Sequence, residues 1–389
     1  MTIPITGQPP VPSLSEPDTF NTKALNLFTW QTGSMLDQFN NVDPNDFFDI
    51  PALTAAAAQS QTKNAIINGA FDVWQRGDTT SVHLGFGADR WQNRFSGGTS
   101  EQGRISIGGS VTLGSNEISN YLYQIVTGQS GSNDHSMIAQ NMENVRTFAG
   151  KTVTVLGWTR LVSGSGSNIA VGFQQSFGTG GSSDNISITS VTVPLVAGWA
   201  PFAATINIPS VAGKTIATDG TDLLRLQFWI SAGSSFNART NSLGIQSPSV
   251  GLWGIHILQG THGVEACDNY IAPRVVDELP RCQRYGYAFV PKGAPAFKLV
   301  GIAHGQNSTN TLNVSLSTVM RAAPSMEYGG EYRLYNIGGP AGNTTTLTLT
   351  DPNPNTVSIS AVAGTFVNNA AMTFKTNTAD CFIFLDAEL

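Results

Sequence analysis

The chain is 389 residues long, has a formal net charge of −6, and only 12% of its residues are charged. Because single hydrophobic cores stop growing at about 250 residues, this length predicts more than one compact unit. The acidic balance disfavours a nucleic-acid partner, since binding to phosphates needs clustered lysines and arginines. The sequence has neither an apolar run long enough to span a membrane nor a secretory signal at its start, so we expect synthesis in the cytoplasm and no membrane insertion.

The first 61 residues are predicted to form an attachment and trimerisation module. Five prolines within residues 1–17 prevent a core, so this arm should run extended along another protein. A helix capped by Asp18 or Thr19 is predicted next, and a second short helix at 51–61. The first helix must bury its apolar face on its own sandwich, against two symmetry mates or on a different protein. Residues three or four apart make up that face: Phe20, Ala24, Leu27, Phe28, Met35 and Leu36.

From Asn64 onwards the pattern changes to an alternation of apolar and polar residues, which predicts half-buried strands. Clusters of glycine, serine and asparagine between the alternating stretches supply turns. Because no amphipathic helices lie between the strands, we predict an antiparallel sandwich or jelly roll over residues 62–275. The clearest strands are predicted at 121–126, 152–158, 169–177, 186–193, 200–208, 223–230 and 250–258.

The strand pattern breaks near 275–285, at Asp277-Glu278-Leu279-Pro280, and then resumes. About seven short strands in about 105 residues match one compact sandwich, so a second, smaller β-sandwich is predicted at 285–389. No fixed-period repeat is present, which argues against propellers and solenoids. The later strands are predicted at 297–303, 311–321, 331–337, 344–350, 356–360, 371–375 and 381–385.

Residues 64–77 read NAIINGAFDVWQRG, and residues 88–91 read ADRW. Asn68-Gly69 supplies a turn before a strand. Arg76, Asp89 and Arg90 can form a charge-assisted network that fixes this turn, because arginine offers five donors to a carboxylate. The large apolar side chains expected to enter the core are Phe71, Val73, Trp74 and Trp91.

These two blocks resemble a segment of many bacteriophage tail-fibre and tail-associated proteins. GIHILQG at 254–260 and ELPRCQRY at 278–285 are similar to the end of that family's carbohydrate-binding-module-like jelly roll, although the family usually reads VQLExG in the first stretch. VMRAAPS at 319–325 is similar to a strand-end motif in the family's C-terminal sandwich, and FNTKA at 20–24 to the particle-proximal start of such fibres. The resemblance implies a virion appendage, commonly trimeric, with β-modules of a type that engages cell-surface glycans.

Catalytic motifs are not found, and we expect neither enzymatic activity nor a cofactor. Gly150-Lys151-Thr152 and Gly213-Lys214-Thr215 lack the first glycine of a P-loop, no GxSxG is present, and the five histidines lack metal-ligand spacing. Aspartate-rich turns at 184–185, 219–222 and 351–355 carry oxygen ligands suited to Ca²⁺ but also spell ordinary turns. Carboxylates considered for glycoside hydrolysis are Asp134, Glu143, Glu265 and Asp268.

Three cysteines, Cys267, Cys282 and Cys381, are too few and too scattered for a disulfide framework or a zinc site. Buried or free thiols, a Cys267–Cys282 bond and a bridge between subunits all remain open.

The leading hypothesis is a non-enzymatic fibre or appendage subunit of a virion, a homotrimer that binds other virion proteins through its N-terminal arm and a host-surface glycan through its β-modules. The alternative is a purely architectural head, collar or tail decoration, and a glycan depolymerase is a third hypothesis. Aromatic rings can serve as platforms for sugar faces. The candidate platforms are Trp199, Trp229, Trp253, Tyr285, Tyr287 and Tyr332.

Overall fold

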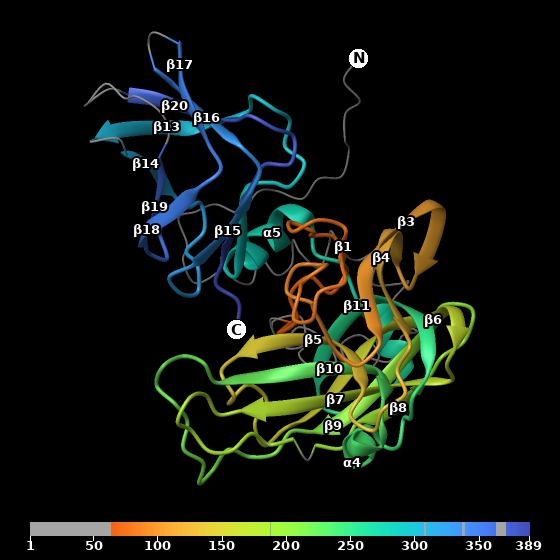
Figure 1. Ribbon diagram of the computed structural model, residues 1–389. Coiled ribbons are helices and arrows are strands. Elements are labelled where there is room, and N and C mark those ends of the chain that lie inside the picture. The colour runs from red at the N-terminus through yellow and green to blue at the C-terminus, as the bar shows by residue number, and fades with distance from the viewer. Residues whose placement is uncertain (1–63, 187, 307–308, 337–338, 363–370) are drawn as a thin grey trace, which may run out of the picture. The chain divides into compact units, whose positions relative to one another are not determined.

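The computed structural model describes residues 64–389 except 187, 307–308, 337–338 and 363–370 (Figure 1). The predicted helices and the apolar face at residues 20–36 lie outside the described residues. Residues 64–389 belong to one compact unit. This unit consists mostly of β-strands, and every strand pairing among the described residues is antiparallel. The predicted mainly β fold class is therefore confirmed.

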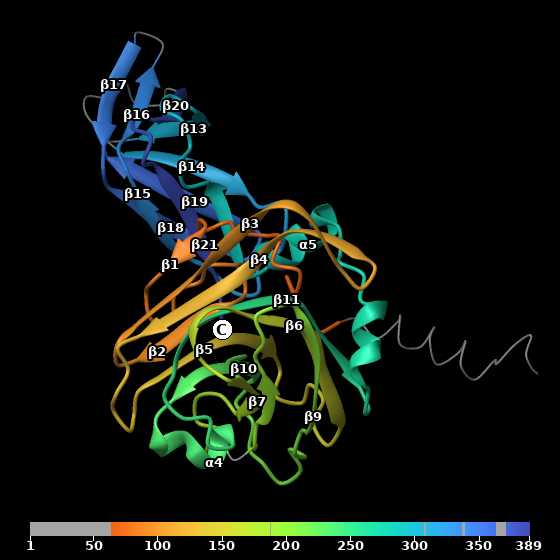
Figure 2. The same cartoon turned by 90° about the vertical axis from the view of Figure 1, so that its right-hand side faces the viewer.

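The first sandwich packs a six-stranded sheet on a five-stranded sheet. The six-stranded sheet has the order β1-β3-β4-β11-β6-β9, with β1 (Thr79–Thr80), β3 (Thr99–Leu113), β4 (Asn116–Thr127), β11 (Ser247–Gln259), β6 (Thr152–Ser165) and β9 (Ala200–Asn207). The five-stranded sheet has the order β2-β5-β10-β7-β8, with β2 (Gln92–Ser96), β5 (His135–Glu143), β10 (Leu223–Ala232), β7 (Asn168–Ser176) and β8 (Val191–Pro194). Two short helical turns, η1 (Ser234–Phe236) and α4 (Asn237–Thr240), follow β10, and Figure 2 shows α4 beside β7 and β10.

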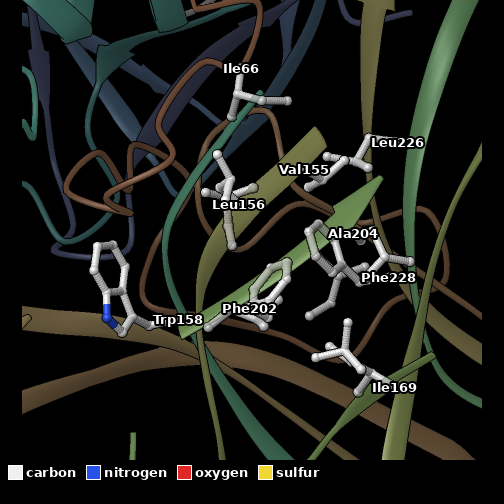
Figure 3. Close-up of a cluster of buried hydrophobic side chains, with 14 of the residues drawn as sticks. Ile66, Val155, Leu156, Trp158, Ile169, Phe202, Ala204, Leu226 and Phe228 are labelled. Atoms are coloured by element: carbon white, nitrogen blue, oxygen red, sulfur yellow. The ribbon is translucent and has the colours of Figure 1, made fainter. Parts of the chain in front are cut away.

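The core lies between the two sheets because their strands alternate in side-chain direction. In β10, Leu224, Leu226 and Phe228 are fully buried in this core, and the residues between them point to the opposite face of the sheet. Figure 3 shows Phe228 and Leu226 near Phe202 and Val155 of the facing sheet. Burial of apolar area at about 25 cal/mol per Å² is the main force that holds the sheets together.

The NAIINGAFDVWQRG segment precedes the strands, and its side chains Ile66, Ala70 and Phe71 pack in this core. Phe71 and Trp91 are fully buried with ring centroids 5.2 Å apart, which confirms the interior role predicted for them. The indole Nε1 of Trp91 donates to the carbonyl of Asn68. Asn68 takes a left-handed conformation, with φ 58°, and its side-chain amide bonds to Val73 and Asp89. The segment is therefore a tightly bonded turn, as expected for Asn-Gly.

A helical stretch separates the two sandwiches. It consists of η2 (Val264–Asn269) and α5 (Val275–Gln283), so the predicted break at 277–280 is a helix with Pro280 inside it. The second sandwich has a three-stranded sheet, β12-β21-β15, and a seven-stranded sheet, β17-β16-β20-β13-β14-β19-β18, around its own core. Their bounds are β12 (Gly286–Val290), β13 (Leu299–Gln306), β14 (Thr309–Ser315), β15 (Ser325–Gly329), β16 (Tyr332–Asn336), β17 (Gly339–Thr344), β18 (Leu347–Pro352), β19 (Thr356–Val362), β20 (Ala371–Thr376) and β21 (Phe382–Asp386).

Two predicted strands are shorter than expected, and several strands were not predicted, among them β2, β3, β5, β12 and β15. The stretch at 186–193 forms a strand only at β8, and that at 311–321 ends with β14 at Ser315. The long strand β3, which forms a hairpin with the predicted strand β4, was not predicted, because Gly103, Gly108 and Gly109 interrupt the alternation in β3. A glycine in a strand weakens the local signal, while pairing to a neighbouring strand restores the structure.

Candidate functional site

The five-stranded sheet has a second face, opposite the core, that carries an unusual set of polar side chains. In β10 this face receives Arg225, Gln227 and Trp229, which alternate with the buried core residues. Strand register places Asn141 of β5 and Gln174 of β7 on either side of Arg225. We call the following set the arginine face: Arg94, Asn141, Gln174, Arg225, Gln227 and Trp229 of the sheet, with Arg239 of α4.

Neutral amide groups hold the three arginines of this face. Nε of Arg225 donates to Oδ1 of Asn141 over 2.7 Å. Nη2 of Arg239 donates to Oε1 of Gln174 over 2.9 Å and to Oε1 of Gln227 over 2.8 Å. These amide side chains are almost completely buried. The sheet therefore provides a rigid, buried layer of amides that orients guanidinium groups above it.

Arg94 completes the set from the edge strand β2. Its Nη1 donates to Oε1 of Gln92 over 2.6 Å. None of the ion pairs found among the described residues includes Arg94, Arg225 or Arg239. The carboxylate of Asp184 lies nearby and accepts hydrogen bonds from Gln174 and Ser176.

Burial and repulsion between neighbouring arginines lower the pKa values on this face. Burial lowers the pKa of Arg225 and of Arg239 to about 10, and repulsion from Arg94 adds to the effect. Asp184 acts in the opposite direction on both groups. All three arginines still carry a full charge at neutral pH, and the nearby side-chain carboxylate is that of Asp184. The last residue, Leu389, also reaches this face, where its carbonyl oxygen accepts a hydrogen bond from Nδ2 of Asn141 over 2.7 Å.

Trp229, one of the predicted platforms, lies on this face but is covered. Its side chain is only 1% exposed, because Phe236, His135 and Arg239 lie over the ring. The Arg239 guanidinium carbon is 5.0 Å from the ring centroid. The Trp229 ring thus packs beneath the Arg239 guanidinium group. The prediction that this ring is an open platform is wrong.

Three other predicted platforms are also interior residues. Tyr285 is 5% exposed beneath Arg90, and Tyr332 is fully buried and donates its hydroxyl to the carbonyl of Phe382. Trp253 is 3% exposed between Trp158 and Tyr270. Sequence alone could not exclude these rings, because an alternating strand buries large side chains on whichever face is covered.

Trp199 and Tyr287 remain partly exposed, so their role as platforms stays a prediction. Trp199 contacts Tyr121 edge to face at 5.1 Å and lies near Arg160. The hydroxyl of Tyr287 is 3.3 Å from that of Ser317 in the second sandwich. The structure does not bring Trp199 and Tyr287 together with the arginine face.

The carboxylates considered for hydrolysis have structural partners or exposed positions. Glu143 accepts two hydrogen bonds from Arg284, and these, against the effect of burial, lower its pKa. Asp134 accepts hydrogen bonds from two backbone amides of its own loop. Asp134 precedes β5 and Glu143 ends it, so about 30 Å of strand separates them, beyond the ~5–9.5 Å of a glycosidase pair. Glu265 and Asp268 are exposed on η2.

Within the described residues, no three histidine, cysteine, aspartate or glutamate side chains lie together as a metal site. Asp219 accepts hydrogen bonds from the backbone and hydroxyl of Thr221, as in an ordinary turn. No helix in the described part of the chain has the length and apolar character needed to cross a membrane.

The charged residues of the first motif have different partners from those predicted. Asp89 accepts hydrogen bonds from Gln75 rather than from an arginine, while Arg76 pairs with Asp386 and Arg90 with Glu388. The predicted local network of Arg76, Asp89 and Arg90 is therefore wrong in its hydrogen bonds. Sequence proximity suggested Asp89, but the fold supplies carboxylates from the last strand and the residues after it.

A small cavity of about 120 Å³ lies next to this motif. Its walls include Arg76, Lys292, Phe382 and Phe384. Arg76 is already engaged there by Asp386 and stacks on the Phe384 ring at 4.1 Å. We therefore regard the arginine face, where charges are not paired, as the better candidate site.

Comparison with known proteins gives structural neighbours only. No family model and no curated protein matches the chain. One neighbour is a CBM4 carbohydrate-binding module (16% identity, 50% of this chain, 98% of the other, TM-score 0.28). Another is the family 11 module from Clostridium thermocellum (10% identity, 48% and 98%, TM-score 0.29). A third is a CBM22 tandem from Paenibacillus barcinonensis (10% identity, 82% and 97%, TM-score 0.27).

Proposed function

We propose that this chain is a non-enzymatic structural subunit of a bacteriophage virion, a fibre or appendage protein that binds a glycan on the host surface through the arginine face. The arginine face is the observation that supports glycan binding. A rigid sheet there presents planar guanidinium groups, fixed from below by Asn141, Gln174 and Gln227. Such pre-orientation lowers the entropy lost on binding, which favours recognition of polar ligands.

The virion half of the proposal rests on the sequence resemblance. Its motif residues Phe71, Trp91 and Arg90 are buried structural elements of the first sandwich, which supports their use as a fold signature and not as a catalytic set. In this proposal residues 1–61 attach the subunit to other virion proteins and to two further copies. A homotrimer would multiply weak single sites into firm attachment.

A purely architectural decoration is the second candidate. It is favoured by the burial of Trp229, Trp253, Tyr285 and Tyr332, since a spacer needs its aromatic residues in the core. The two candidates differ in whether the chain binds a glycan at all.

The deciding experiment measures binding of the purified full-length chain to an array of bacterial surface glycans and to phage-sensitive cells. The receptor function predicts saturable binding that an Arg225→Gln variant loses. An absence of binding to both, together with capture of a virion protein by residues 1–61, would instead support the decoration. Detection of the chain in purified particles by mass spectrometry tests the virion role separately.

A further inference from the structure

We propose that the arginine face binds an anionic saccharide, a glycan that carries carboxylate, sulfate or phosphate groups. This inference rests on the proposed glycan-binding function and names the class of its ligand.

The arginine face carries more positive than negative charge. The chain as a whole has a net charge of −6, yet Arg94, Arg225 and Arg239 gather on one face of one sheet. Asp184 is the carboxylate close enough to influence both Arg225 and Arg239. Half-buried guanidinium groups without a carboxylate partner are costly, because burial weakens their hydration. A ligand with negative charge would supply the missing partner.

The hydrogen-bonding groups of the three arginines on this face are all donors. The amide oxygens of Asn141, Gln174 and Gln227 already accept hydrogen bonds from Arg225 and Arg239. Guanidinium groups can only donate. The N–H groups that remain on this face therefore match a group that only accepts, such as a carboxylate or sulfate. A neutral sugar hydroxyl both donates and accepts, so it would use such a face poorly.

Arg239 also has a structural role, because it stacks on Trp229 and bonds to two glutamines. Tests should therefore use Arg225 and Arg94, at which glutamine removes the charge and retains an amide. Asp184→Asn offers a test of opposite sign: it removes the negative charge that competes with the ligand and keeps a side-chain oxygen. Arg274→Gln is the matched control, since Arg274 is an exposed arginine at the start of α5.

The experiment measures binding of the full-length chain to four polymers with one backbone: dextran, carboxymethyl dextran, dextran sulfate and phosphodextran. We expect at least one charged polymer to bind about tenfold or more tightly than dextran, with affinity falling as salt rises from about 50 to about 300 mM. Arg225→Gln and Arg94→Gln should each reduce that affinity about tenfold, and Asp184→Asn should raise it. Comparison of the three charged polymers identifies whether carboxylate, sulfate or phosphate is preferred.

Thermal melting of each variant establishes that it is folded. If Arg225→Gln does not fold, Arg94→Gln tests the proposal in its place. Equal affinity for dextran and its charged forms, or an equal loss in Arg274→Gln, would overturn the anionic ligand. Binding of a neutral array glycan that Arg225→Gln abolishes would also overturn it while leaving the proposed function intact. Absence of saturable binding to every polymer and array glycan would overturn both.

Discussion

Arg90 and Glu388 form a buried ion pair between residues 298 positions apart in the chain. Their side chains are 1% and 8% exposed. Arg90 also donates to the backbone carbonyl of Asn141 and lies 3.4 Å from the ring centroid of Tyr285. The ADRW segment thus fastens residues that follow the last strand β21 against the first sandwich.

Glu388→Gln should strongly destabilise the fold. The substitution keeps the shape of the side chain but leaves the Arg90 charge buried without its counter-charge. Breaking a buried pair in this way costs about 3–5 kcal/mol. Equilibrium unfolding in guanidinium chloride measures the free energy of unfolding directly.

The matched control is Asp277→Asn, which breaks the ion pair of Arg274 and Asp277. That pair is exposed, with side chains 78% and 57% accessible, and exposed pairs contribute about 0–1 kcal/mol. Similar losses in Glu388→Gln and Asp277→Asn would contradict the buried pair.

Sequence alone predicted the burial of apolar residues near Arg90 but not the ion-pair partner of Arg90. Burial of Phe71 and Trp91 was predictable, because large apolar side chains have few other places to go. The partner of Arg90 was not, since nothing local in the sequence indicates a carboxylate 298 residues away.

The arginine face, too, was only partly predictable from the sequence. The alternation of Arg225, Gln227 and Trp229 between core residues was visible, and it predicts a polar second face on strand β10. Its neighbours Asn141 and Gln174 depend on strand register, and Arg239 depends on where α4 packs. Both are set by tertiary packing, which no local pattern encodes.

Gly69→Ala should destabilise the first sandwich. A Cβ at this position would lie 2.0 Å from the carbonyl oxygen of Ile255, whose amide donates to the carbonyl of Gly69. Because backbone must move to relieve the clash, we expect a loss of about 3 kcal/mol or more in the free energy of unfolding. Gly198→Ala is the control, since an added Cβ there meets no atom within 4 Å and should change stability by less than about 0.5 kcal/mol. A stable Gly69→Ala variant would show that the segment packs differently.

Acid should destabilise the protein partly through His256. This ring is 5% exposed, stacks on Tyr270 at 4.8 Å, and its Nδ1 lies 2.9 Å from the carbonyl oxygen of Gly254. Burial lowers the pKa of His256 below 6.5. The unfolded chain therefore binds a proton more readily, so the contribution of His256 is present above pH 6.5 and is lost as pH falls through the pKa of the folded state.

Urea unfolding at several pH values from about 7.5 to about 5 tests this expectation, where one proton changes stability by at most about 1.4 kcal/mol per pH unit. His256→Gln should flatten the slope but not abolish it, because burial also lowers the pKa of His83 and His135. His304→Gln, at an exposed position, is the control for the loss of a histidine as such. Identical slopes for His256→Gln and the unmodified chain would contradict the assignment.

The three cysteines should react with a thiol reagent only when the protein unfolds. Cys267, Cys282 and Cys381 are all free and buried, so the alternative of a Cys267–Cys282 bond is not what the structure contains. Burial raises the pKa of Cys267 to about 11 and that of Cys282 well above its usual value. Since the thiolate is the reactive form, both burial and the raised pKa slow labelling.

Labelling with a chromogenic disulfide at pH 8, without prior reduction, provides the measurement. We expect almost no reaction in the native protein and three thiols per chain after addition of denaturant. A matched exposed cysteine, introduced as Ser235→Cys in η1, reports that the reagent is active on the folded protein. Fewer than three native thiols after denaturation would reveal a disulfide within or between chains. Rapid native labelling would instead show that these sites open to solvent far more often than a packed sandwich core allows.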